Sequence, residues 1–447
     1  MTTADFSLGN SQTLDTNASS DTGIFATYGV DVAFDSAVTN SQIAVSNNTQ
    51  FGEALGNSAT NSVQLIAVGA GTSGNDPTAA LNNVQSGLGA DVAATSEMAL
   101  FANIASSGSM IALNGNSNTS LGAINNASNS VSVSGLAIDG ATGLASVNVT
   151  TNLTTADYAL NNNQLASGAL SSTAETTAYN LDNLAADPTT SGILNGSASL
   201  SKNTTTAEAS SNRVANSLAV SATDNGATAA IGNEQISSAG VTATASSSAY
   251  TLDLTTTTAA TYAASASSIA IEGNTTTALA RGNSASNVLN YSATVAFNGV
   301  TTAPVSTGPG VASAGTGILN YQENSGAVAA NASSVTYAAG LSGPATATAG
   351  SALNSSVSLG NNAASAVAFG NTATNTLTMA TWSAGIPSSA ISSIQSNGAA
   401  VTATATTVAF NVTPTGAASG SAFRNSGNST TAQAIGNNSV STIGGGM

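Results

Sequence analysis

The stretch from Asn274 to Tyr291 reads NTTTALARGNSASNVLNY, and it decides the fold. Its asparagines include Asn283 and, four residues later, Asn287. From Asn283 onward, asparagine and apolar residues alternate with serine and other residues. A period of two is typical of a β-strand and not of a helix. The pattern therefore predicts a strand whose carboxamides face inward with the apolar side chains.

The same arrangement recurs along the chain. Asparagines nine residues apart occur as Asn48/Asn57, Asn116/Asn125, Asn203/Asn212, Asn274/Asn283, Asn362/Asn371 and Asn428/Asn437. The second asparagine usually follows glycine, which favours a sharp corner. Four residues after it come Asn61, Asn129, Asn216, Asn287 and Asn375, with Ser441 in the last copy.

A second motif alternates with the first. It reads Leu/Ile-x-Asn-x-Gln, then a turn of small residues, then Val-x-Ala, and its glutamines are Gln12, Gln85, Gln164, Gln235, Gln322 and Gln395. Repetition of this kind predicts a stacked architecture. We interpret residues 1–447 as a single array of six imperfect repeats, at approximately 8–80, 81–159, 160–230, 231–317, 318–390 and 391–443.

The inward carboxamides need a structural explanation. A buried carboxamide is costly unless its donors and acceptors are paired. Identical side chains stacked along a β-array satisfy one another and fix the strand register. We predict such structural ladders for Asn57, Asn61, Asn125, Asn129, Asn212, Asn216, Asn283, Asn287, Asn371, Asn375 and Asn437, and for Gln12, Gln85, Gln164, Gln235, Gln322 and Gln395.

These patterns predict an all-β fold, a β-solenoid or β-helix-like rod with inward Asn/Gln ladders. The two motifs lie 21 residues apart between Asn212 and Asn233. This spacing suggests layers of about 22–25 residues, three or four per repeat. On the order of 20 layers would then give a body roughly 90–100 Å long. The proline-bearing segments after Gly299 and around Pro387 are expected to be protruding turns.

The composition excludes several functions. The chain has 5% charged residues, a net charge of −16, and neither Cys nor His. It therefore has no thiol or imidazole for catalysis or metal binding. Its four basic residues are too few to form the positive surface that binds the phosphate backbone of a nucleic acid. No apolar stretch approaches the roughly 18 residues of a membrane span, and the first residues lack a signal-peptide pattern.

The acidic residues do not indicate a site. Asp15 with Asp21, or Asp31 with Asp35, could share calcium, but no calcium-loop motif surrounds them, so we interpret them as solvated charges. Acidic residues do not recur at equivalent repeat positions, as paired catalytic carboxylates would. We therefore predict no enzyme, no catalytic residues, no metal site and no cofactor.

Two segments carry a family resemblance: GNSATNSVQL from Gly56 and GNSASNVLNY from Gly282. With glutamine-bearing partners such as LNNVQSGLGADVAA from Leu81, they resemble the Asn/Gln repeats of bacterial curlins and Fap-type amyloid subunits, and those of holdfast-anchor proteins. The resemblance implies an exported protein that assembles at the cell surface as a fibre or matrix component.

We therefore expect an extracellular structural subunit that polymerises with itself end to end. A cell-surface anchor or an exporter is a further expected partner; nucleic acid and a membrane span are not. The joint is predicted to stack the segment near Leu8 on the segment near Asn437 of the next subunit. The alternative is a monomeric surface adhesin or phage-type fibre stalk that binds a ligand through loops.

Overall fold

The protein is all-β, as predicted, and its sheets are mainly parallel. The computed structural model describes residues 2–22, 27–29, 38–68, 77–103, 106–138, 145–149, 152–182, 193–247, 250–255, 262–296, 303–307, 310–334, 337–343, 350–381, 388–407 and 410–446. These residues form no helix. Five of the sheets pair their strands in parallel, and a sixth is antiparallel.

Two sheets carry the first motif and the glutamine-bearing part of the second. The long-strand sheet contains β7 (Thr49–Val68), β12 (Ser117–Ile138), β19 (Thr204–Asn225), β25 (Thr275–Ala296), β33 (Ala363–Thr381) and β39 (Ser429–Gly446). The Gln-strand sheet contains β2 (Phe6–Leu14), β8 (Ala79–Gly87), β15 (Tyr158–Ala166), β20 (Ala229–Ser237), β28 (Thr316–Asn324) and β34 (Ser389–Asn397).

The other sheets complete the layers. A ten-stranded parallel sheet contains β3 (Ala18–Thr22), β4 (Thr27–Gly29), β9 (Val92–Asn103), β16 (Ala169–Asp182), β21 (Gly240–Ser247), β22 (Tyr250–Thr255), β29 (Val328–Ser334), β30 (Tyr337–Ser342), β35 (Val401–Thr407) and β36 (Phe410–Thr415). One six-stranded sheet contains β5 (Val38–Thr39), β10 (Ser106–Ser107), β17 (Ile193–Leu194), β23 (Tyr262–Ser265), β31 (Gly350–Leu353) and β37 (Ala418–Ser419). Another contains β6 (Gln42–Ser46), β11 (Met110–Asn114), β18 (Ser197–Ser201), β24 (Ser268–Glu272), β32 (Ser356–Gly360) and β38 (Ala422–Ser426). The antiparallel side sheet contains β1 (Thr2–Thr3), β13 (Ala145–Val149), β14 (Asn152–Ala156), β26 (Ala303–Thr307) and β27 (Gly310–Ala314).

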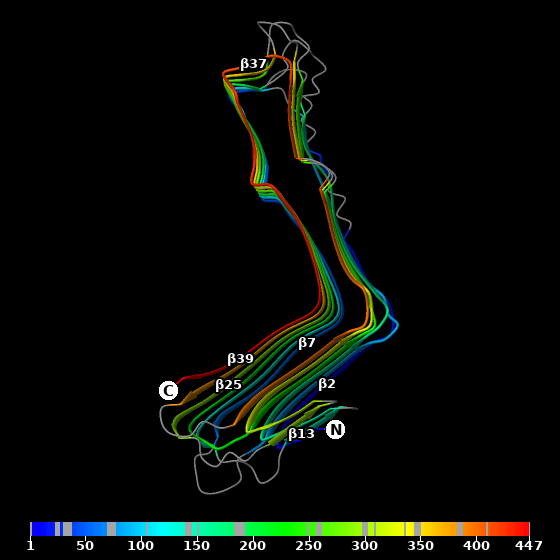
Figure 1. Ribbon diagram of the computed structural model, residues 1–447, viewed down its shortest axis with the longest axis vertical. Coiled ribbons are helices and arrows are strands. Elements are labelled where there is room, and N and C mark those ends of the chain that lie inside the picture. Colours follow the sequence, from blue (N-terminus) through cyan, green and yellow to red (C-terminus); the bar gives the residue numbers. More distant parts are fainter. Residues whose placement is uncertain are drawn as a thin grey trace.

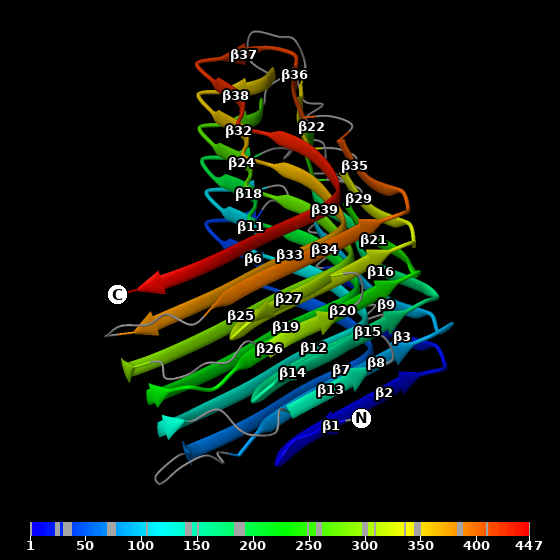
Figure 2. The same cartoon turned by 60° about the horizontal axis from the view of Figure 1, so that its bottom comes forward.

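Each repeat forms one layer of the stack. Asn125 of β12 pairs with Asn57 of β7 on one side and with Asn212 of β19 on the other. The prediction of 22–25-residue layers is therefore wrong, and so is the long rod derived from it. With layers about 4.8 Å apart, six layers make a stack only roughly 30 Å high. Figure 1, viewed down the shortest axis, shows the layers nearly superimposed, and Figure 2 separates them.

Within a layer, the chain runs along one wall and returns along the other (Figure 1). The core lies between the walls. Alanine dominates one cluster, which includes Ala207, Ala243 and Ala330, whereas bulkier residues such as Leu81 and Tyr158 fill another. No described sheet closes or curls on itself, so the β-solenoid interpretation stays a proposal.

Two inner strands of the Gln-strand sheet, β15 and β20, are covered on both faces. In β15, eight of the nine residues are buried, because the side sheet packs on the face opposite the long strands. Ala156 of the side sheet packs with Ala230 and Leu319 of the Gln-strand sheet. One predicted protruding turn contributes to this cover, since β26 and β27 form a hairpin that contains Pro304. Pro387 lies outside the described residues.

Two turns with left-handed backbone precede each long strand. The first has positive φ at Asn40, Gly108, Asn195, Ala266, Asn354 and Gly420. The second, seven residues later, has positive φ at Asn47, Gly115, Lys202, Gly273, Asn361 and Gly427. Glycine and asparagine suit this conformation best. These turns therefore fix the corners of every layer.

Candidate functional site

The predicted ladder residues lie in columns that run along the stack. In the Asn57 column, the Nδ2 of each asparagine donates to the Oδ1 of its counterpart in the next layer. The distances from Asn57 through Asn125, Asn212, Asn283 and Asn371 to Asn437 are 2.8, 2.8, 2.8, 2.8 and 2.7 Å. The inner members are fully buried. Hydrogen bonds to the neighbouring carboxamides thus replace those that each side chain would make with water.

Backbone carbonyls orient the carboxamides of this column. The second N–H of Asn125 donates to the carbonyl oxygen of Leu165 at 2.8 Å, and that of Asn283 to Glu323 at 2.8 Å. Because a carbonyl oxygen only accepts, the nitrogen must lie on that side. The column therefore has a fixed direction, with donors pointing toward the C-terminal layer.

Two further asparagine columns face each other across the core. The Asn61 column runs through Asn129, Asn216, Asn287 and Asn375 to Ser441, at 2.8, 2.9, 2.8, 2.8 and 3.3 Å. The Asn10 column runs through Asn83, Asn162, Asn233 and Asn320 to Ser393, at 2.6, 2.8, 2.9, 2.8 and 3.3 Å. Asn61 also donates to Asn83 at 3.0 Å. These contacts join the long-strand sheet to the Gln-strand sheet.

The glutamine column runs in the opposite direction. Here Nε2 of each glutamine donates to Oε1 of the preceding layer, from Gln395 through Gln322, Gln235, Gln164 and Gln85 to Gln12, at 2.6, 2.7, 2.7, 2.7 and 2.7 Å. A long-strand carbonyl again fixes each amide, as Gln164 donates to the Arg213 oxygen at 2.9 Å. Donors of this column therefore point toward the N-terminal layer.

The structure adds one column to the predicted ladders. It contains Asn48, Asn116, Asn203, Asn274, Asn362 and Asn428, the first members of the nine-residue pairs, with Nδ2–Oδ1 distances of 2.9, 2.9, 3.0, 2.9 and 3.0 Å. Their spacing signals this role. The Oδ1 atoms also accept backbone N–H groups, as Asn274 does from Asn203 at 3.1 Å.

The long strands bend just before the Asn57 column, at the elbow seen in Figure 1. Gly282 and Gly370 occupy this position in two successive layers. A Cβ on Gly282 would lie 2.4 Å from the Gly370 carbonyl oxygen, and one on Gly370 would lie 2.5 Å from that of Gly436. Other layers place Ile124 and Ser211 there, and Ile124 lies where a Cβ on Gly87 would. The Ile124 side chain of the long strand thus fills the space that a Cβ on Gly87 of the Gln strand would need.

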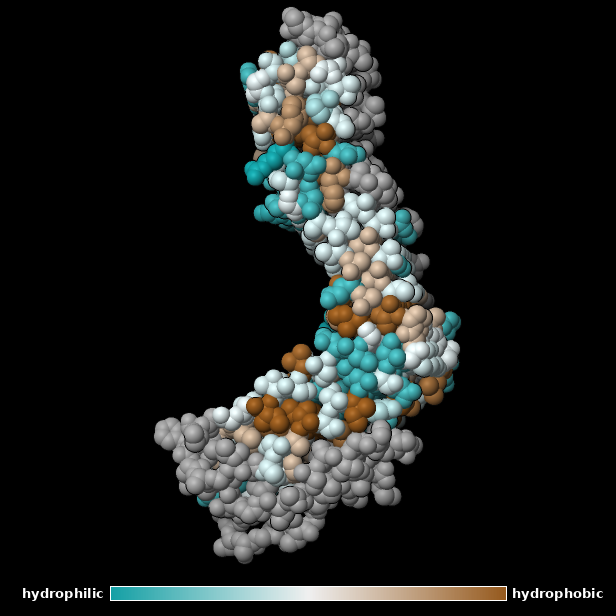
Figure 3. Space-filling view, in the orientation of Figure 1, coloured by the Kyte–Doolittle hydropathy of each residue, from teal (hydrophilic) through white to brown (hydrophobic). Residues whose placement is uncertain are grey.

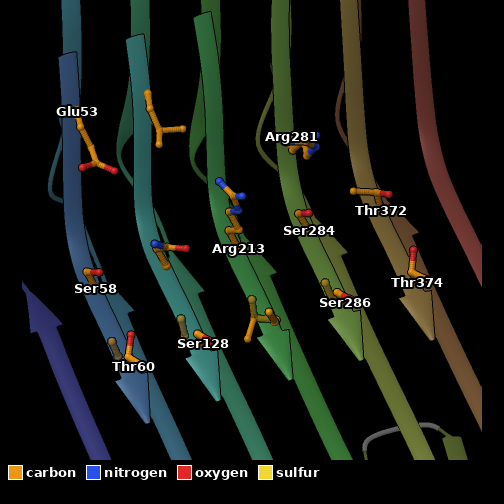
Figure 4. A pocket seen from close by; sticks show the side chains of 17 residues that line it. Glu53, Ser58, Thr60, Ser128, Arg213, Arg281, Ser284, Ser286, Thr372 and Thr374 are labelled. Atoms are coloured by element: carbon orange, nitrogen blue, oxygen red, sulfur yellow. The ribbon is translucent and has the colours of Figure 1, made fainter. Parts of the chain in front are cut away.

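The long strands carry a shallow polar groove of about 600 Å³ on their solvent-facing side, at the inside of the bend that gives the molecule its curved outline (Figure 1, Figure 3 and Figure 4). Hydroxyls such as Ser58, Ser284 and Thr372 line it. Arg281 forms an ion pair with Glu208, and Arg213 lies 3.8 Å from the same carboxylate oxygen. The hydroxyls of this groove can form hydrogen bonds with a polar ligand. Its two arginines, however, already interact with Glu208.

One buried tyrosine closes the far end of the long strand. The Tyr291 hydroxyl oxygen lies 2.8 Å from Asn225 Oδ1 and 2.5 Å from the Ala227 carbonyl oxygen, and its single hydrogen is available to either acceptor. Burial, with smaller contributions from Asp157 and Tyr158, raises the pKa of Tyr291 well above its usual value. Its hydroxyl is therefore a structural donor.

No group of acidic side chains in the described ranges is placed to hold a metal ion. Of the acids considered for calcium, Asp31 and Asp35 lie outside the described residues. Within the described part of the chain, no helix could span a membrane. No family model, curated protein sequence or solved structure matches the chain.

Proposed function

We propose that the protein is a structural subunit of an extracellular fibre or surface matrix. Its layers would wind as a β-solenoid, and subunits would polymerise end to end without catalysis. A cell-surface anchor or an exporter would be the other partner. Extracellular assembly rests on the sequence pattern and on the resemblance given above.

One observation supports end-to-end assembly: the outer layers of the stack are open. Leu377 of β33 is fully buried, whereas its counterpart in the last layer, Ile443 of β39, is 50% exposed. β39 and β7 are the two edge strands of the long-strand sheet. Such edges offer backbone groups and apolar surface to another strand.

Electron microscopy of the purified protein by negative stain tests this function. Long filaments of uniform width are expected, and fibre diffraction should place the roughly 4.8 Å strand spacing along the filament axis. Discrete particles at every concentration would contradict the proposal and favour the monomeric adhesin or fibre stalk.

A matched pair of variants isolates the end layer. Ile443→Asp should block filament formation, because it places a carboxylate where the next layer would bury an apolar residue. Val440→Asp adds the same charge to β39 at a 53%-exposed side chain of the outer face. Filaments should still form with this control. Equal loss in both variants would show that charge alone, and not stacking, prevents assembly.

A further inference from the structure

The two ends of the stack carry complementary polar groups. At the first layer, Asn57 Oδ1 accepts no hydrogen bond from the described residues, although every later Asn57-column oxygen accepts one from the layer before it. At the last layer, the one contact of Asn437 Nδ2 within the described part of the chain is with the Gln395 carbonyl, at 3.5 Å. One end thus presents an acceptor and the other a donor.

The glutamine column presents the reverse pair. Inner glutamines use Nε2 twice, once on a backbone carbonyl and once on a glutamine of the preceding layer. Among the described residues, Gln12 in the first layer uses it only on the Ser58 carbonyl, at 2.8 Å. In the last layer, Gln395 Oε1 accepts no hydrogen bond from the described residues, whereas Gln322 Oε1 accepts one from Gln395.

From these end groups we infer a head-to-tail, in-register joint between two copies of this chain. The inference rests on the proposed function. Asn437 of one copy donates to Asn57 of the next, and Gln12 of the next donates to Gln395. Ser441, which stands where inner layers have asparagine, donates to Asn61. Ile443 covers Val63, the first-layer residue of its column.

The joint differs from the one predicted from sequence. Leu8 belongs to the Gln-strand sheet, whose last-layer counterpart is Ile391 of β34, and not to the column of Asn437. Each end strand therefore meets the strand of its own sheet. A joint of two like ends is disfavoured, because it would set Asn57 acceptors against each other or Asn437 donors against each other.

Cysteine cross-linking tests polarity and register, since the chain has no cysteine of its own. Ser58 and Asn438 are exposed members of one column, five layers apart in one molecule and hence about 24 Å from each other. Across the inferred joint they would be adjacent. Ser58→Cys with Asn438→Cys should therefore give covalent multimers with a short bismaleimide.

Three controls separate the other joints. Ser58→Cys alone and Asn438→Cys alone should give no cross-link, because a head-to-tail joint never places two copies of either residue together. Ser58→Cys with Thr442→Cys, displaced by four residues or roughly 13 Å along the strand, should also fail to link. Dimers from either single variant, or links from the displaced pair, would overturn the inferred joint.

Donor loss gives a second measurement. Asn437→Asp should slow elongation at least about ten-fold, because it sets a carboxylate against Asn57 Oδ1. Asn438→Asp adds the same charge on the exposed face and should change elongation little. Filaments without the expected links would refute this joint alone. Absence of assembly in the unmodified protein would refute both the joint and the proposed function.

Discussion

Asparagine serves the interior of this protein because its carboxamide carries donors and an acceptor together. A side chain inside a column needs a group above, a group below and a backbone carbonyl across the core, and Asn212 has all three at 3.0 Å or less. A carboxylate has no donor, and an apolar residue would leave its neighbours unpaired. Few described buried polar side-chain atoms lack a partner: Asn163 Oδ1, Ser210 Oγ and Asn324 Oδ1.

Asn287→Asp should therefore destabilise the protein. It replaces the Nδ2 that donates to Asn375 at 2.8 Å with a carboxylate oxygen. We expect a loss of about 2–4 kcal/mol at pH 7 by chemical denaturation. Burial raises the pKa of such an aspartate, so the loss should shrink as the pH falls and the folded state binds a proton.

Asn290→Asp is the control, since Asn290 lies on the same strand but is exposed. It should change stability by less than about 0.5 kcal/mol. Equal effects in both variants, or no pH dependence for Asn287→Asp, would contradict a buried ladder at this position.

The turn position of Ala266 predicts an increase in stability. Its φ of 46° is strained for alanine, whereas Gly108 and Gly420 occupy the same turn in other layers. Ala266→Gly should raise the free energy of unfolding by about 1 kcal/mol. Ala270→Gly, within β24, should lower it by roughly 0.5–1 kcal/mol. Thermal melts of both variants would measure the difference, and a lower melting temperature for Ala266→Gly would contradict a strained turn.

The residue pattern predicted some features and not others. The period of two places Asn283, Asn287 and Leu289 on one face, and these residues are buried together. The left-handed turns could not be predicted, because Lys202 and Ala266 occupy positions where other layers have glycine or asparagine. Only the register between layers reveals these positions as equivalent.

At the scale of elements, the long strand changes its inward face where it bends. In β25, Thr276, Ala278 and Ala280 face inward before the elbow, and Asn283 does so after it. The inward set thus shifts by one residue at Gly282, where the pairing between layers is interrupted. The core-facing side chains of this strand therefore lie at even-numbered positions before the elbow and at odd-numbered positions after it.

Gly370→Ala should disturb this elbow. Its Cβ would lie 2.4 Å from Asn397 Oδ1 and 2.5 Å from the Gly436 carbonyl, so the backbone of the next layer must shift. We expect a loss of about 1–3 kcal/mol. Gly436→Ala is the matched control, because its Cβ would meet only Asn397 Nδ2 at 3.6 Å. Similar denaturation midpoints for the two variants would mean that the layers have room for a methyl group here.

The sequence predicts the wrong size for a layer. It suggests that the 21-residue spacing between the two motifs is a step along the stack. This spacing is instead a crossing of the core, where Asn216 of β19 donates to Asn233 of β20 at 3.4 Å. Sequence spacing alone does not separate these cases, because both place carboxamides within hydrogen-bonding distance.

At the scale of the molecule, the layers are equivalent enough to be removed. Ala229 of β20 pairs with Thr316 of β28, and the strands between them form one layer. Deletion of residues 229–315 should leave a folded protein one layer shorter, because Asn212 would then stack on Asn371. Circular dichroism and limited proteolysis would show retained β-structure. A variant that lacks residues 229–273 should not fold, because it keeps the long strand β25 but loses the other strands of that layer, β20 to β24.

The register between layers also has a kinetic consequence. Hydrogen bonds along the Asn57 column join residues 66–88 positions apart, so the first two layers must close very long loops before any ladder forms. Proteins dominated by such distant contacts fold slowly. Once one pair of layers exists, its edge is a template, and every later layer adds to a surface already in place. Folding of the monomer and growth of a filament would then be the same elementary step, with the slow event at the nucleus.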